Sequence, residues 1–186
     1  MQFKRLLILA SLVITSYAQT SVAQKVEDDI NNKIAPALDI LLSSIDAFPI
    51  SNGTVIQALT IHTNAIDLNT TLVDTTNDMN VEACEFITSD AQTILCDLKA
   101  LLPKIQQSLT DIVARKAAFQ ALPLGDIPGV IKDDLNLLSQ DTETLASSFT
   151  NCAPEIDVEQ PDVLPGIKDL FSEVKDAFGP AIAAFA

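Results

Sequence analysis

The sequence of 186 residues contains no tryptophan, one tyrosine and one histidine, yet 48% of it is hydrophobic, so its main resource is apolar surface for burial. Catalysis usually needs several convergent acid, base or nucleophilic groups, and a metal site needs clustered His, Cys or carboxylate ligands. His62 and three cysteines supply little of this material. We therefore expect no catalytic residues, no metal site, no cofactor and no enzymatic activity. The shortage of Trp and Tyr also disfavours carbohydrate binding through aromatic stacking.

The N-terminus has the features of a secretory signal peptide. Lys4 and Arg5 precede a short apolar run, and small residues follow up to Ala18. We expect cleavage after Ala18, with Ala23 as the alternative, which divides the chain into a signal peptide (1–18) and a single domain (19–186). The apolar run is shorter than the roughly 20 residues needed to span a bilayer, and no other stretch is longer. The sequence therefore predicts an extracellular protein with no transmembrane segment.

The chain is strongly acidic, and this charge limits its partners. Removal of Lys4 and Arg5 with the leader lowers the net charge from −14 to −16. Such a surface repels nucleic acid and anionic lipid head groups. Any contact with lipid must therefore come from apolar burial.

Apolar residues recur at three- and four-residue steps in five stretches, which is the spacing of amphipathic helices. Pro, Gly and Asn separate these stretches, and no sustained alternation predicts a strand. The expected helices cover about residues 26–48, 54–76, 89–113, 130–149 and 162–185. Short connections favour antiparallel neighbours, so we predict an all-α, up-and-down antiparallel bundle of about five amphipathic helices.

The second stretch carries two apolar stripes instead of one. At 100° per residue they merge into an arc of about 180°, so this helix either packs between two neighbours or lines a cavity. His62 lies on one stripe, as a core histidine with one hydrogen-bond partner or as a polar group that meets a fatty acid carboxylate. The first stripe is Val55, Leu59, His62, Ile66 and Val73, and the second is Ile61, Ala65, Leu68 and Leu72.

The three cysteines are an odd number for an oxidising compartment, which predicts one disulfide and one free thiol. In an up-and-down bundle the loops after the second and fourth helices lie at the same end. This arrangement favours a disulfide between Cys84 and Cys152, and Cys84 with Cys96 is the alternative. Two sequons, at Asn52 and Asn69, satisfy the glycosylation rule. Asn52 lies in a predicted turn and is expected to be used, whereas Asn69 projects between the two apolar stripes.

Several segments resemble the fungal hydrophobic surface binding protein A family and the related cell-wall galactomannoproteins. The most specific is residues 115–128 (RKAAFQALPLGDIP), and shorter matches lie at residues 45–49, 58–62, 89–95 and 178–185. The resemblance covers essentially the whole domain after the leader. It implies a secreted, non-enzymatic helical bundle that adsorbs to hydrophobic surfaces and helps to recruit a polyester-degrading hydrolase. It also implies cell-wall association and, from the galactomannoproteins, fatty acids held between helices.

Two functions follow from these observations. The first is binding of hydrophobic surfaces, fatty acids or other lipids by apolar helix faces. The alternative is a structural cell-wall or adhesion protein with a solid helical core and no ligand. The candidate ligand-contacting residues are Leu59, His62, Ile66, Leu98, Ile105, Leu109, Leu135, Leu138, Phe171 and Phe178.

Overall fold

A computed structural model describes residues 21–80, 84–153 and 162–186, and helices make up nearly all of these ranges. The predicted signal peptide and its cleavage after Ala18 lie outside the described residues. The helices are α1 (Val22–Asp29), the π-helical segment η1 (Ile30–Ile34), α2 (Ala35–Ala47), α3 (Val55–Met79), α4 (Thr88–Ala114), α5 (Lys116–Gln120), α6 (Ile127–Cys152) and α7 (Val163–Ala184). The all-α prediction is confirmed.

The first three elements, α1, η1 and α2, form one continuous helical unit, which we call the N-terminal rod. Ser21 begins it with a capping box, because its side chain accepts from the Gln24 backbone N–H and the Gln24 side chain accepts from Ser21. The π-helical segment ends two residues before Pro36. Proline has no N–H to continue an α-helical ladder, so a change of helix type at this point has a local cause.

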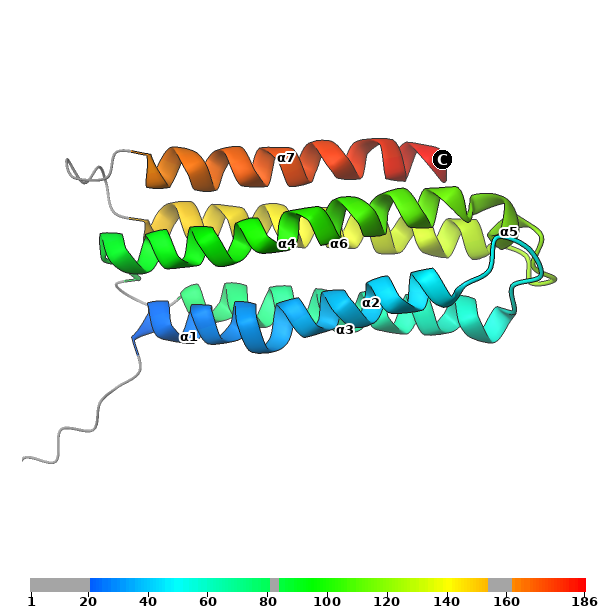
Figure 1. The fold of residues 1–186 in the computed structure, drawn as a ribbon, viewed down its shortest axis with the longest axis horizontal. Coiled ribbons are helices and arrows are strands. Elements are labelled where there is room, and N and C mark those ends of the chain that lie inside the picture. Colours follow the sequence, from blue (N-terminus) through cyan, green and yellow to red (C-terminus); the bar gives the residue numbers. More distant parts are fainter. Residues whose placement is uncertain (1–20, 81–83, 154–161) are drawn as a thin grey trace, which may run out of the picture.

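The long helices form a closed ring. The N-terminal rod packs against α3 and α4, α3 packs against α6, α6 against α7, and α7 against α4. Figure 1 shows these helices lying side by side and alternating in direction along the chain. Ring neighbours are therefore not always chain neighbours, because α4 follows α3 in sequence but lies between the rod and α7. A ring of five helices leaves space along its axis.

Aromatic clusters lie at both ends of the ring. At one end Phe48, Phe119 and Phe185 pack together, and the first two rings stack with centroids 4.2 Å apart. Toward the other end Phe149 contacts Phe86 and Phe171. Both ends of the ring thus carry bulky aromatic side chains.

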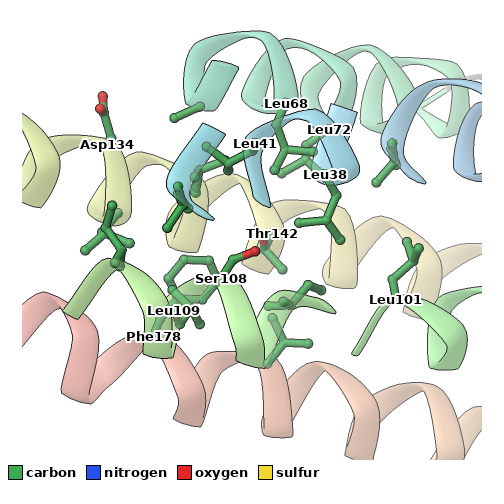
Figure 2. A pocket seen from close by; sticks show the side chains of 18 of the residues that line it. Leu38, Leu41, Leu68, Leu72, Leu101, Ser108, Leu109, Asp134, Thr142 and Phe178 are labelled. Atoms are coloured by element: carbon green, nitrogen blue, oxygen red, sulfur yellow. The ribbon is translucent and has the colours of Figure 1, made fainter. Parts of the chain in front are cut away.

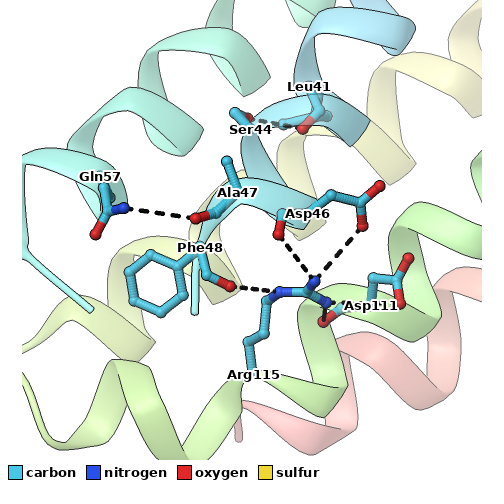
Figure 3. Close-up of polar contacts among 8 residues, drawn as sticks. All are labelled: Leu41, Ser44, Asp46, Ala47, Phe48, Gln57, Asp111 and Arg115. Carbon is cyan, nitrogen blue, oxygen red and sulfur yellow. Dashed lines mark hydrogen bonds and ion pairs between the residues drawn. The ribbon is translucent and has the colours of Figure 1, made fainter. Parts of the chain in front are cut away.

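Arg115 fastens the end of α2 to the end of α4, as Figure 3 shows. Its Nε donates to the Phe48 carbonyl at 2.8 Å, and a terminal nitrogen donates to the Asp111 carbonyl at 2.9 Å. The carboxylates of Asp46 and Asp111 each lie 3.5 Å from the guanidinium. One side chain thus satisfies carbonyl groups at two helix C-termini that have no partner within their own helices.

At the opposite end a disulfide joins Cys84, which precedes α4, to Cys152, the last residue of α6. The two residues are 68 positions apart in the sequence. The Phe86 N–H also donates to the Cys152 carbonyl at 2.8 Å. Cys96 remains a free, exposed thiol.

Candidate functional site

The ring encloses a central cavity whose wall is almost wholly apolar. All of its helices contribute, and Figure 2 shows Leu38 and Leu41 of α2, Leu68 and Leu72 of α3, and Leu109 of α4 around the space. The wall extends on α6 from Ile131 to Leu145, which is about 21 Å at 1.5 Å per residue. The other lining residues are Ile34, Ile45, Ile61, Ala65, Leu98, Leu101, Ile105, Ser108, Ile112, Asp134, Leu135, Leu138, Thr142, Leu170, Phe171, Val174 and Phe178.

Among the described residues, Ser108, Asp134 and Thr142 alone bring polar groups to this wall. The Ser108 hydroxyl donates to the Lys104 carbonyl of its own helix at 2.9 Å, so it offers the cavity only an acceptor. The Asp134 carboxylate is turned away from the leucine side chains (Figure 2). The cavity is therefore suited to a hydrocarbon chain and offers its middle no cation to hold a charged group.

The cavity is long but narrow. Its volume is about 110 Å³, whereas pockets that hold small molecules usually measure roughly 300–1,000 Å³. A long alkyl chain therefore fits only if the helices move apart or the leucine side chains change rotamer.

His62 and Asp134 link α3 to α6 beside the cavity. The Nδ1 of His62 lies 2.9 Å from both carboxylate oxygens of Asp134. The Asp134 side chain is only 11% exposed, whereas that of His62 is 39% exposed. Burial raises the pKa of the Asp134 carboxyl, and the hydrogen bond from His62 partly offsets this rise. His62 is thus a partly exposed residue that hydrogen-bonds to Asp134, and it does not line the cavity.

The structure brings seven of the ten candidate residues to the cavity and leaves three outside. Those on the wall are Leu98, Ile105, Leu109, Leu135, Leu138, Phe171 and Phe178. The placement of Leu59, Ile66 and His62 on the wall was wrong. Leu59 is 47% exposed and Ile66 is 38% exposed.

The error on α3 has a geometric cause. A helix in a ring presents only a narrow arc to the centre, and α3 presents the stripe of Ile61, Ala65, Leu68 and Leu72. An apolar arc of about 180° does not say which of its edges points inward. The small residues Ala58 and Ala65 on this buried face were a usable signal, because they let helices approach closely. The polar wall residues Ser108 and Thr142 carried no sequence signal at all.

The two sequons differ in exposure, because the first lies in a turn and the second on a helix that packs against its neighbours. Asn52 is exposed in the turn before α3 and has a φ of 60°, a left-handed conformation that Asn tolerates well. Asn69 is partly buried on α3, and its side-chain Oδ1 is buried without a hydrogen-bond partner. A glycan on Asn52 would extend into solvent.

The described ranges contain no group of three or more His, Cys, Asp or Glu side chains placed to hold a metal ion. In the same ranges, every helix is too short or too polar to cross a membrane.

Fold and cavity together define the class of this protein: an all-helical bundle built as a ring around an apolar cavity. Residues 23–150 match the hydrophobic surface binding protein A family, and the chain belongs to that family. It is 28% identical over 127 residues to cell wall mannoprotein 1 of Aspergillus flavus, which corresponds to 68% of this chain and 43% of the relative. The chain thus spans less than half the length of this curated relative.

Two solved structures share the fold. The first is AFMP4P in complex with palmitic acid, with a TM-score of 0.76 and 22% identity over 88% of this chain and 99% of that one. The second is ligand binding domain 1 of the MP1 protein of Penicillium marneffei, complexed with arachidonic acids. It has a TM-score of 0.70 and 15% identity over 89% of this chain and 97% of that one. At these identities the likeness establishes the fold alone.

Proposed function

We propose that this protein is a secreted, non-enzymatic binder of long-chain fatty acids or similar single-chain lipids, which it holds in the central cavity. The observation that carries the proposal is a wall about 21 Å long with apolar side chains from every helix of the ring. Burial of alkyl surface contributes about 25 cal/mol per Å², which supplies the driving force. The cavity weighs against the alternative of a structural protein with a solid core.

The fatty acids in the related structures support this proposal, because those proteins share the fold and hold palmitic or arachidonic acid. Secretion is supported by the family, and the helix cap favours the first of the two predicted cleavage sites. Cleavage after Ala18 leaves Ser21 to cap the rod, whereas cleavage after Ala23 removes the cap and a buried residue. Recruitment of a secreted hydrolase and attachment to the cell wall remain predictions.

Leu138 and Leu137 offer a matched test on one helix. Leu138 lines the cavity, and Leu137 is 36% exposed. Leu138→Trp fills the cavity and is expected to weaken palmitic acid binding at least tenfold, whereas Leu137→Trp leaves it unchanged. Titration calorimetry on delipidated protein measures both. The chain has no other Trp, so fluorescence also reports whether each new ring is buried.

Overpacking of this kind costs about 1–3 kcal/mol of stability, so both variants must first be shown to remain helical. Equal palmitic acid affinity in the two variants, or no binding by the native chain, would contradict the cavity assignment.

An exposed apolar stripe on α3 favours a second function, which is adsorption to apolar surfaces. Leu59, Ile66 and Val73 form an exposed stripe along α3 and are 37–47% exposed. We expect the double variant Leu59→Ser, Ile66→Ser to adsorb less to polystyrene beads while binding palmitic acid as the native chain does. Unchanged depletion from solution by the beads would exclude this stripe as the adsorbing surface.

A further inference from the structure

A second hollow lies on the surface between α6 and α7, toward the disulfide end of the ring. It is lined by Ala146, Ser147, Thr150, Asn151, Lys168 and Phe171. Phe171 also lines the central cavity. The side chain of Phe171 is therefore part of both walls, and it packs against Phe149 with ring centroids 5.7 Å apart. We call this surface hollow the α6–α7 groove.

The α6–α7 groove contains a cation that forms no ion pair within the described ranges. Lys168 is exposed and lies one helical turn before Phe171, and it makes no ion pair with any described residue. The next lysine on this helix, Lys175, pairs with Glu143 at 3.2 Å. In a chain with a net charge of −14, Lys168 places a positive charge in a groove that shares the side chain of Phe171 with the central cavity.

The other polar groups of the groove leave few hydrogen-bond donors for a ligand. The Ser147 hydroxyl donates to the Glu143 carbonyl and the Thr150 hydroxyl to the Ala146 carbonyl, both at 2.9 Å. The Asn151 amide has no hydrogen bond within the described part of the chain. The donors that remain are the Lys168 ammonium and the Asn151 amide, and both suit a carboxylate.

We propose that the α6–α7 groove is the entrance and head-group subsite of the central cavity. The Lys168 ammonium and the Asn151 amide hold a fatty acid carboxylate there, while the acyl chain passes Phe171 into the cavity. This inference rests on the proposed lipid binding. It assigns the charged end of the ligand to a site outside the cavity, whose interior offers no cation.

The head-group subsite predicts a charge-dependent loss of affinity. Lys168→Gln is expected to weaken palmitic acid binding about three- to tenfold, because an exposed charge pair contributes modestly. The same change leaves the affinity for methyl palmitate unaltered, and Lys168→Arg retains acid binding. Lys99→Gln on α4 makes the same charge change outside the groove and should have no effect. Calorimetry with both ligands measures these affinities.

The outcomes separate this inference from the proposed function. Equal loss for acid and ester, or equal loss in Lys168→Gln and Lys99→Gln, overturns the subsite and leaves cavity binding intact. Failure of the native chain to bind either ligand overturns both.

If palmitic acid leaves the cavity through the α6–α7 groove, a change in the side chain that separates the two should alter the rate of its release. Phe171→Ala removes the ring between groove and cavity and should speed palmitic acid release to phosphatidylcholine vesicles about tenfold. Phe178→Ala removes the same volume from the cavity wall two turns further along α7 and should speed release much less. Equal acceleration in the two variants would place the exit elsewhere.

Discussion

Leu98 and Leu95 allow a stringent test of the cavity, because they lie one turn apart on α4. Both are buried, at 7% and 3% exposure, but only Leu98 lines the cavity. Truncation to Ala removes about three carbon groups, worth roughly 0.8 kcal/mol each, and adds a term for the void left behind. We expect Leu95→Ala to cost about 3–5 kcal/mol. Leu98→Ala should cost about 2.5–3 kcal/mol, because Leu98 already borders a void.

Palmitic acid should change the loss of stability in Leu98→Ala but not the loss in Leu95→Ala. At a palmitic acid concentration of about 100 times its dissociation constant, binding stabilises a folded protein by about 2.7 kcal/mol. The acyl chain can occupy the space vacated in Leu98→Ala, so the deficit of this variant relative to the native chain should shrink by about 1 kcal/mol. The deficit of Leu95→Ala should stay constant.

Urea unfolding followed by far-ultraviolet circular dichroism, with and without palmitic acid, measures all four differences. If the ligand changes the two deficits equally, the cavity wall has been wrongly assigned.

Four further predictions concern stability and modification. Cys152→Ser removes a disulfide that closes a 68-residue loop and should lower the free energy of unfolding by about 3–4 kcal/mol in urea titrations. Burial raises the pKa of Asp134, so the native chain loses stability as the pH rises from the ordinary carboxyl pKa through the raised one; Asp134→Asn should therefore gain stability relative to the native chain over that interval, measured by urea titrations at a series of pH values. Arg115→Lys loses the forked contacts to two helix ends and should cost about 1–2 kcal/mol, with faster proteolysis of the turn before α3 as a second readout. Mass spectrometry of the secreted protein should find glycan on Asn52 and little on Asn69.

The helices were predictable because their buried faces repeat at the α-helical period over many turns. The predicted stretch 54–76 corresponds to α3 (Val55–Met79), and the stretch starting at 162 corresponds to α7. The five-residue helix α5 was missed, since a single turn leaves no periodic pattern. The order of helices around the ring was also beyond the sequence, because short connections alone suggest that successive helices pack together.

The sequence predicted an apolar binding site and most of the residues that line it, but not which edge of α3 faces the cavity. Leucines such as Leu109 and Leu138 lie on single apolar stripes, where the buried direction is unambiguous, and both line the cavity. Leu59 lies at the edge of a broad arc, and only the neighbours of α3 determine that it faces outward. The partner of His62 comes from α6, 72 residues away, which no local pattern could indicate.

The odd number of helices in the ring affects the order in which it can fold. Five helices cannot alternate in direction around a closed circle, so some neighbours must run parallel, as α3 and α6 do. Parallel neighbours cannot be joined by a short turn, and their contacts form between distant parts of the chain, which slows folding. The ring closes only when α7 docks between α4 and α6. We therefore expect a chain that ends before Val163 to leave one apolar side open and to bind a hydrophobic dye strongly, whereas a chain that includes α7 does not.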